Sequence, residues 1–493
     1  MVDIFAFSPT SALLCVVVLV LLWLLTRRPP GLPPGPLLFP FVGNALSMDS
    51  DPRVTYKKLR QRYGDIFSVY MFNKPIIVLN GYSTLRDAIV KNADVFSDRP
   101  HSTFNDFILK GKGLTGTSGA LWREQRRFTL NTLREFGAGR NIMEGKIHEE
   151  VMNFVEALEA EQGQVFDIKR LVHNAVCNVI CSTMFSKRFE YTDPVFMQAL
   201  KAMDEYIANL GSSGLLNVLP IVRFLPGDLF KFKATVQSSQ TFVSLLVEPM
   251  IKDHLQTHDE DIVDDFIHAY IKEMRLRKEK EDETTLDLEN LVMVVGDLFA
   301  AGTETTATII RWTLVHLLHN PDVQEKCFQE IKGNIGQSRL PSMKDKVSVP
   351  YVEATIMEVL RLSDIAPSSL PHTVPYGVQF RGYTFPKGVP VIVMLDSVLQ
   401  DPDVWGDPDN FRPDRFLDDT GKIVKKEEFI PFSLGRRACL GESMARMELF
   451  LFLTTMIQRF KFAPMDGQMP SMDAIIGITY SPRPFLVKAI PRI

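Results

Sequence analysis

The residues best suited to chemistry lie around one cysteine near the C-terminus, in Phe432-Ser433-Leu434-Gly435-Arg436-Arg437-Ala438-Cys439-Leu440-Gly441. An amphipathic run of strong helix formers, 442–452, follows this stretch directly. The sulfur of Cys439 would therefore face the positive end of a helix dipole and several free backbone N–H groups. Both features lower the pKa of a thiol, so the sequence predicts a cysteine that is kept ionised and able to hold a metal.

The residues around Cys439 fit a flat, anionic ligand. Gly435 and Gly441 allow the backbone to approach such a ligand where a Cβ atom would collide. Arg437 can pair with a carboxylate on the ligand, and Phe432 can cover the sulfur. This is the chemistry of a cysteine that holds haem iron and pushes electron density onto it. The alternative is a buried structural cysteine in a glycine-rich loop.

A second unusual feature is the middle of a long apolar segment, residues 288–319, whose helical period ends before Pro321. Glycine and repeated threonine in Ala300-Ala301-Gly302-Thr303-Glu304-Thr305-Thr306 weaken a helix interior. A carboxylate such as Glu304 is also costly to bury. This combination predicts an opened helical turn that admits oxygen and water, and a kink with a packing role is the alternative.

Both stretches resemble motifs of the cytochrome P450 family. The cysteine loop matches every position of Phe-x-x-Gly-x-Arg-x-Cys-x-Gly, and the helix matches Ala/Gly-Gly-x-Asp/Glu-Thr-Thr. The resemblance implies haem b with Cys439 as the axial thiolate, and Phe432, Arg437 and Gly441 around it. It also implies that Thr305 and Glu304 deliver protons to bound oxygen and that Ala301 lies against the haem face.

Further haem contacts are implied by the same resemblance. Trp122 and Arg126 lie at i and i+4, so an indole N–H and a guanidinium share one helix face. They are similar to the family's Trp-x-x-x-Arg, which contacts a haem propionate. Arg99 and His372 match propionate contacts of related animal members, although a lone histidine is more often a core residue.

A structural network is expected from Glu358, Arg361 and Arg415. The first two lie at i and i+3 on an apolar helix, 351–362, which alone would be a weak surface pair. With Phe411-Arg412-Pro413-Asp414-Arg415-Phe416, they resemble the family's Glu-x-x-Arg and Pro-x-Arg pairing. The resemblance implies a buried network that braces the haem loop.

The substrate pocket is expected to be apolar. In the family, a C-terminal hairpin (here 475–482), the loop 366–370 and the region 104–114 reach the pocket. The residues expected to line it are Phe104, Phe107, Ile108, Leu114, Phe299 and Ile478.

The N-terminus is expected to anchor the chain in a membrane. Residues 4–25 are almost wholly apolar, and Arg27 and Arg28 follow them. Because positive charge on this flank favours a cytosolic remainder, an uncleaved signal anchor is preferred over a cleaved signal peptide. The expected organisation is an anchor helix at 1–26, a proline-rich hinge at 27–36 and a catalytic haem domain at 37–493, on the endoplasmic reticulum. Residues 210–231 either dip into lipid or pack in the core.

Composition limits the alternatives. The chain has 493 residues, 45% of them hydrophobic, and a net charge of −4, which gives no sign of nucleic-acid binding. Five scattered cysteines do not form a disulfide framework. Residues 66–80 are expected to form two short strands with a turn at Asn73-Lys74-Pro75. The resemblance implies a mainly α-helical fold with a small β-rich lobe.

The expected activity is insertion of one oxygen atom from dioxygen into an apolar small molecule: a fatty acid, a steroid or a xenobiotic. Electrons are expected from an NADPH-dependent flavoprotein reductase, with cytochrome b5 as a further donor. Two rivals stay open: a haem-thiolate isomerase or dehydratase of lipid peroxides, and a non-catalytic haem- or lipid-binding protein.

Overall fold

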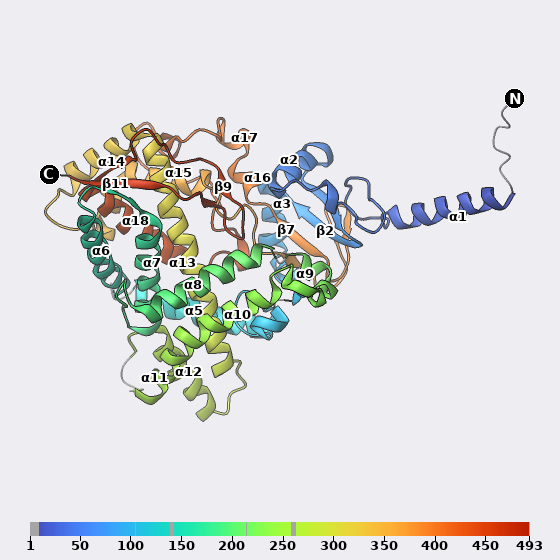
Figure 1. The fold of residues 1–493 in the computed structure, drawn as a ribbon, viewed down its shortest axis with the longest axis horizontal. Helices are drawn as coiled ribbons and strands as arrows, with labels where there is room; N and C mark the ends of the chain where they lie inside the picture. The colour runs from blue at the N-terminus through green and yellow to red at the C-terminus, as the bar shows by residue number, and fades with distance from the viewer. Residues whose placement is uncertain (1–8, 104, 139–141, 213, 258–262, 493) are drawn as a thin grey trace. The chain divides into compact units, whose positions relative to one another are not determined.

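The computed structural model describes residues 9–103, 105–138, 142–212, 214–257 and 263–492. They form two compact units. The first unit comprises the described residues up to Pro100 together with Ser368–Ser397, and the second comprises those of His101–Pro367 and Val398–Ile493. Helices dominate and the sheets are small (Figure 1). The predicted fold class, mainly helical with a β-rich part, is confirmed in these respects.

The first unit contains a four-stranded sheet in the order β1-β2-β7-β4. β1 (Ile66–Met71) and β2 (Lys74–Leu79) are antiparallel, with Ile66 opposite Leu79. β2 then runs parallel to β7 (Pro390–Val393), and β4 (His372–Thr373) is antiparallel to β7. The hairpin expected within residues 66–80 is therefore present.

The remaining elements of the first unit are short apart from two helices. Its described helical segments are α1 (Pro9–Thr26), η1 (Ala45–Ser47), α2 (Pro52–Tyr63), α3 (Tyr82–Arg86), η2 (Asp87–Lys91) and α4 (Ala93–Phe96), and a separate hairpin pairs β5 (Val378–Phe380) with β6 (Tyr383–Phe385). The helix α16 (Asp396–Leu399) begins with the last two residues of the first unit, Asp396 and Ser397.

The proline-rich segment 27–36 is neither helix nor strand. Arg28 ties it to β1, because one guanidinium nitrogen donates to the Ser68 hydroxyl at 2.5 Å and another to the Pro36 carbonyl at 2.6 Å. Among the helices in the described part of the chain, none has the length and apolar character required to cross a bilayer.

The second unit is built mostly of helices. Its longer ones are α5 (Gly119–Ala138), α6 (Ile142–Ala160), α7 (Ile168–Phe185), α8 (Pro194–Ser212), α10 (Phe232–Phe242), α11 (Glu248–Thr257), α12 (Phe266–Glu279), α13 (Leu288–His319), α14 (Pro321–Asn334), α15 (Pro350–Leu362) and α18 (Glu442–Arg459). Short helical segments are η3 (Asn105–Leu109), α9 (Gly214–Val218), η4 (Pro220–Phe224), η5 (Pro226–Asp228), η6 (Val243–Val247), η7 (Met343–Ser348), α17 (Pro402–Trp405), η8 (Pro413–Phe416) and η9 (Gly435–Arg437).

Two small sheets complete this unit. One has the order β3-β11-β8 (Val165–Asp167, Leu486–Pro491, Phe460–Pro464). The other pairs β9 (Ala474–Ile475) with β10 (Ser481–Pro482), which is the C-terminal hairpin expected from the sequence.

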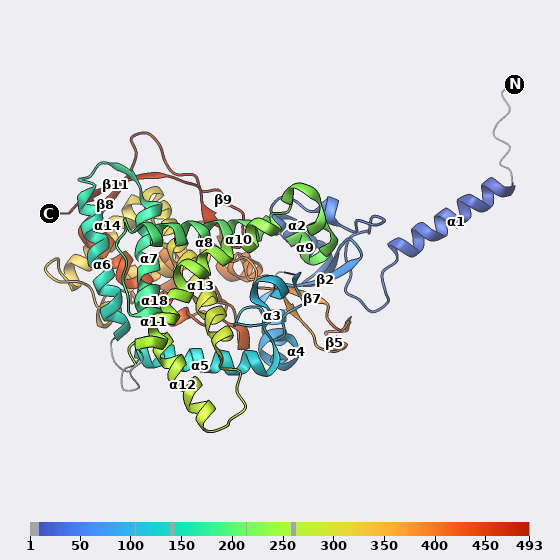
Figure 2. The same cartoon turned by 60° about the horizontal axis from the view of Figure 1, so that its bottom comes forward.

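The helix α13 is the central element of the second unit and packs against α7, α15 and α18 (Figures 1 and 2). It begins after Asp287, whose carboxylate accepts the Asn290 N–H as an N-cap, and it ends before Pro321. These are the bounds that the sequence predicted. The opened turn around Glu304 is not seen, because the segment is α-helical throughout. Threonine hydroxyls here bond back to the helix instead of opening it.

Candidate active site

The loop before Cys439 is closed by a backbone hydrogen bond and places the sulfur near the start of α18. Ser433 and Gly435 have positive φ values of 63° and 72°, which glycine adopts without strain. The Cys439 N–H then donates to the Phe432 carbonyl at 2.9 Å, which closes the loop. α18 begins at Glu442, with Gly441 just before it. The cysteine therefore lies at the N-terminal end of this helix.

The pKa of the Cys439 thiol is raised, whereas the sequence predicted that it is lowered. Burial raises the pKa of its thiol, although the N–H groups of Gly441 and Glu442 and the charge of Arg126 lower it. The residue still keeps exposed surface. The low pKa predicted for Cys439 is wrong for the protein without a bound metal. Burial of the thiol raises its pKa more than the N–H groups at the start of α18 lower it. A coordinated metal cation would remove the thiol proton outright, so these surroundings fit a metal-bound thiolate better than a free one.

Three of the predicted propionate contacts converge beside this loop. Trp122 and Arg126 come from α5, and Arg437 comes from the cysteine loop. The guanidinium carbon of Arg437 lies 3.7 Å from the centroid of the Trp122 ring, and that of Arg126 lies 5.9 Å away. These distances are typical of cation–π contacts. Two stretches more than 300 residues apart thus bring two cations and an indole together.

Both guanidinium groups are also anchored to backbone oxygens. Arg126 donates to the Ala438 carbonyl at 2.5 Å, and Arg437 donates to the Thr117 carbonyl at 2.6 Å. Burial lowers the pKa of Arg126, and among the described residues no carboxylate forms an ion pair with it. A partly desolvated guanidinium of this kind suits an anionic group such as a propionate. The residues present therefore fit haem.

The middle of α13 presents small and polar groups. Ala301 is exposed although the helix is otherwise largely buried, so this position could lie against a flat ligand. The Thr305 hydroxyl donates to the Ala301 carbonyl at 2.6 Å. The Glu304 carboxylate accepts from the hydroxyls of Thr308 and Thr479, at 3.3 and 3.4 Å. Each of the two side chains thus has hydrogen-bond partners of its own, and their role in proton delivery stays a prediction.

Two further residues near Glu304 were not predicted. The Nδ1 atom of His173, from α7, lies 3.4 Å from a carboxylate oxygen of Asp204, from α8. One polar atom from each of these residues and one Glu304 oxygen all lie within 4.8 Å of one another. His173 is buried, whereas the side chain of Asp204 is 36% exposed. Sequence spacing gave no signal, because the three come from three helices.

Asp297 was also missed. It lies seven residues before Glu304 on α13 and accepts the N–H groups of Leu114 and Thr115, at 2.7 and 2.9 Å. Burial raises the pKa of this carboxyl group. The separation of seven residues, two helical turns, was the one signal that could have indicated it. Asp297 fixes the loop that carries Leu114.

Glu358, Arg361 and Arg415 form one fully buried ion-pair network. The Glu358 carboxylate accepts from Arg361 at 2.8 and 2.9 Å and from Arg415 at 2.9 Å. The exposed fractions of the three side chains are 0%, 0% and 2%. Further guanidinium N–H groups donate to the carbonyls of Leu399 and Trp405, the last residues of the short helices α16 and α17. The network therefore fixes the loops that follow residue 398.

Arg99 and His372 lie together in the first unit. Arg99 donates to the carbonyls of Leu370 and Pro371, at 2.7 and 2.9 Å. The buried His372 ring places Nδ1 2.6 Å from the Phe96 carbonyl. Both residues thus fix the strand β4 against the chain that follows α4.

Comparison with known proteins identifies the family. The family model described as "Cytochrome P450" matches residues 33–489. The chain belongs to the cytochrome P450 family. It is 38% identical to human "Cytochrome P450 2U1" over 97% of this chain and 93% of that protein, and 39% identical to human "Cytochrome P450 2J2" over 95% and 93%. It is also 38% identical to golden hamster (Mesocricetus auratus) "Cytochrome P450 2D28" over 98% of both. Membership in this family implies a haem-thiolate monooxygenase.

The residues expected to line the pocket of this cytochrome P450 differ in how much of each side chain is exposed. Ile108 and Leu114 are buried, whereas Phe107 and Ile478 are 46% and 42% exposed. Phe104 lies outside the described residues.

Phe299 is fully buried, with its ring 4.9 Å from that of Phe242 and 6.5 Å from that of Phe185. Core packing accounts for Phe299, and its place in the pocket of the cytochrome P450 stays a prediction.

Proposed function

We propose that this cytochrome P450 inserts one atom of dioxygen into an apolar small molecule, a fatty acid, steroid or xenobiotic, and reduces the other atom to water. The observation that carries the proposal is the meeting of the Cys439 loop with Trp122, Arg126 and Arg437 in the second unit. The electrons come from NADPH through a flavoprotein reductase, with cytochrome b5 as a second donor.

Haem, when bound, supplies the activation of dioxygen. The Cys439 sulfur would hold the haem iron, with Phe432 and Gly441 shaping its loop. Arg126 and Arg437 would pair with the propionates, and Trp122 would add an indole N–H. Arg99 and His372 are assigned to the same task by resemblance.

Thr305 and Glu304 hold and move the protons that oxygen cleavage consumes. The Thr305 hydroxyl can rotate from the Ala301 carbonyl to a ligand on the exposed side of α13. Glu304, next to it, is held by two hydroxyls and can exchange a proton with the group that includes Asp204. Proton delivery of this kind contributes about 10²–10⁴-fold to a rate.

The reductase is proposed to dock on the basic residues near the cysteine. Arg436 belongs to the cysteine loop, and Arg123, Arg127 and Arg134 lie on α5. Opposite charges speed association and fix its orientation. Charge reversal at Arg123 and Arg127 is therefore expected to slow reduction by the reductase.

We place the protein on the endoplasmic reticulum membrane with its catalytic part in the cytosol. The proposal rests on the apolar run 4–25 and on the arginines that follow it. It is supported by exposed apolar side chains within residues 210–231: Ile221 and Phe224, each 74% exposed, and Leu229, 70% exposed. Deleting residues 1–26 should move part of the protein from the membrane pellet to the supernatant, and exchanging the three side chains for serine should move more.

The activity is tested by reconstitution in lipid with reductase, NADPH, ¹⁸O-labelled dioxygen and a pooled lipid and steroid extract. We expect a product that carries one labelled oxygen atom and that disappears when the reductase is omitted. Cys439→Ser should abolish this product. Products that form without label and without reductase would instead establish an isomerase or dehydratase.

A further inference from the structure

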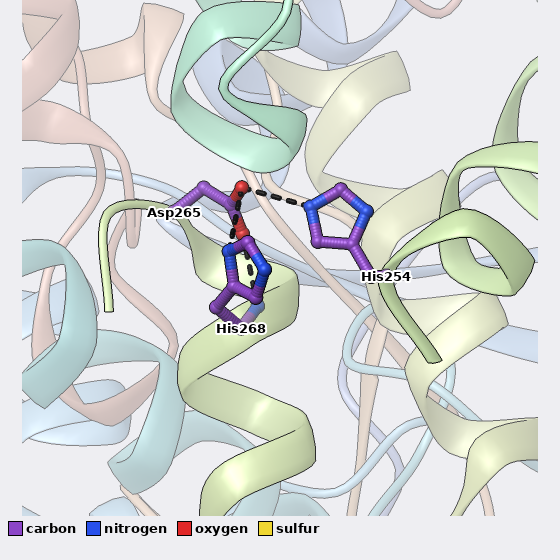
Figure 3. A group of neighbouring side chains, drawn as sticks. All are labelled: His254, Asp265 and His268. Atoms are coloured by element: carbon purple, nitrogen blue, oxygen red, sulfur yellow. Dashed lines mark hydrogen bonds and ion pairs between the residues drawn. The ribbon is translucent and has the colours of Figure 1, made fainter. Parts of the chain in front are cut away.

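A cluster of two histidines and an aspartate lies where α11 meets α12 in the second unit, on residues for which the monooxygenase reaction has no use. Figure 3 shows His254 from α11 and His268 from α12, both turned toward Asp265. The His254 Nε2 atom lies 2.9 Å from Asp265 Oδ2, and the His268 Nδ1 atom lies 3.2 Å from the same oxygen. We propose that His254, Asp265 and His268 form a binding site for a divalent transition-metal ion, zinc foremost.

The hydrogen bonds of His254 require a positive charge at this place. Its Nδ1 atom lies 2.7 Å from the Met250 carbonyl, which can only accept, so Nδ1 carries a proton. Its Nε2 atom faces a carboxylate oxygen, which also accepts when ionised. Either a second proton or a metal ion must therefore lie between Nε2 and Asp265. A histidine that donates Nδ1–H to a carbonyl and offers Nε2 is oriented as metal-binding histidines are.

Hydrogen bonds also position the other two side chains of the cluster. One Asp265 oxygen accepts the backbone N–H of His268 at 2.9 Å, which fixes the carboxylate and leaves the second oxygen toward both rings. The His268 Nδ1 atom also lies 2.8 Å from Asp264 Oδ1, so a fourth ligand is at hand. Lys146 donates to the carbonyls of Ser182 and Asp264, which leaves the carboxylates to the metal.

The distances fit a small tetrahedral ion. Zinc binds histidine nitrogen and carboxylate oxygen at roughly 2.0–2.1 Å, so two ligand atoms of a tetrahedron lie about 3.3 Å apart. The 2.9 and 3.2 Å separations need only small shifts to reach that spacing. Imidazole with carboxylate favours zinc and its transition-metal neighbours over calcium or magnesium, which prefer oxygen alone.

The three side chains of the cluster are mostly buried, which favours tight binding of a metal ion. Asp265 is fully buried and the His254 side chain is 7% exposed, whereas His268 is 14% exposed and gives an ion access. The two rings lie 4.4 Å apart, centroid to centroid. A metal here would hold the end of α11 to the start of α12, although eight residues, 258–265, separate the two helices.

The test uses the full-length haem-loaded protein, stripped with a chelator and dialysed against ZnCl₂ at micromolar free zinc. Metal content is measured by mass spectrometry, and the zinc K-edge X-ray absorption spectrum reports the ligands. We expect one zinc ion per chain, with imidazole nitrogen among its ligands and bonds of about 2.0–2.1 Å. His268→Gln should weaken zinc binding more than about tenfold.

His268→Gln is chosen because it leaves the backbone N–H that caps α12 on Asp265. The matched control is His148→Gln, since His148 contacts only the Pro341 carbonyl among the contacts described for it; it should bind zinc like the unaltered protein. Zinc binding that His268→Gln leaves unchanged, or no zinc binding at all, would overturn the proposal. If His268→Gln does not fold, the absorption spectrum of the unaltered protein decides, and a spectrum without imidazole ligands rejects the site.

Discussion

The guanidinium of Arg437 lies over the indole of Trp122, with 3.7 Å between the guanidinium carbon and the ring centroid. The contact joins the cysteine loop to α5, and Arg437 adds hydrogen bonds to the carbonyls of Leu114 and Thr117. One side chain thus orders three segments next to the cysteine.

Replacing Arg437 by lysine should weaken haem retention although the charge is kept. Lysine loses the planar fork and the stacking on Trp122, and a desolvated cation–π contact contributes about 2 kcal/mol. We expect haem to leave at least about tenfold faster, measured by transfer to an excess of apomyoglobin. Arg436→Lys, at the exposed neighbouring position, serves as the control and should release haem at the original rate.

Removing the charge of Glu358 should strongly destabilise the second unit. Glu358→Gln leaves the guanidinium group of Arg361 buried without its carboxylate and leaves Arg415 with Asp407 alone, which costs about 3–5 kcal/mol. The measurement is the urea midpoint of unfolding together with the haem content. Glu325→Gln removes a half-exposed partner of Arg492 and should cost at most about 1 kcal/mol. Equal effects of the two substitutions would contradict the bracing role.

Thr305→Ala should separate electron consumption from product formation. The variant lacks the hydroxyl that we assign to proton delivery, so product formation should fall about 10²-fold. NADPH oxidation should continue and yield hydrogen peroxide instead. Thr305→Ser keeps the hydroxyl and should restore most of the product per NADPH, whereas an equally uncoupled serine variant would rule out this role.

Glu150 should make stability depend on pH. Burial raises the pKa of its carboxyl group to about 7, against the hydrogen bonds from Tyr191 and Arg188, which lower it. The folded protein then holds a proton that the unfolded chain releases above about pH 4.5. The free energy of unfolding should therefore fall as pH rises from about 4.5 to 7, by on the order of 3 kcal/mol from this group.

Glu150→Gln should flatten this pH dependence, because the amide does not titrate. Thermal unfolding midpoints between pH 5 and 8 provide the measurement. Glu149→Gln, at the exposed neighbouring position, should leave the slope unchanged, and an unchanged slope in Glu150→Gln would refute the assignment.

The sequence predicted those parts of the structure that local rules control. The bounds of α13 followed from a helical period that ends before Pro321, and the hairpin β1–β2 followed from a short turn between two apolar runs. The motif around Cys439 indicated which side chains would meet at the candidate site. Trp122 and Arg437 do meet. Their separation along the chain carries no geometric information, so only the family resemblance could indicate this contact.

Other features could not be predicted because they depend on burial. The direction of the Cys439 pKa shift is set by protein packed around the thiol, which outweighs the helix start. His173, Asp204 and Glu304 come from three helices, and no spacing rule relates them. Phe299 packs against Phe242 in the core, and no spacing rule relates these two residues of different helices.

The base of the hairpin β9–β10 is held through backbone atoms. The Tyr480 N–H donates to the Ile365 carbonyl, and the Trp312 indole donates to the Tyr480 carbonyl. At the tip, Ile476 and Ile478 are 44% and 42% exposed. Because the base is held through backbone atoms, substitutions at the tip leave the fold intact. Gene duplicates of this chain can therefore diverge at Ile476 and Ile478 at little cost in stability, and sequence differences between paralogues should concentrate at these two positions.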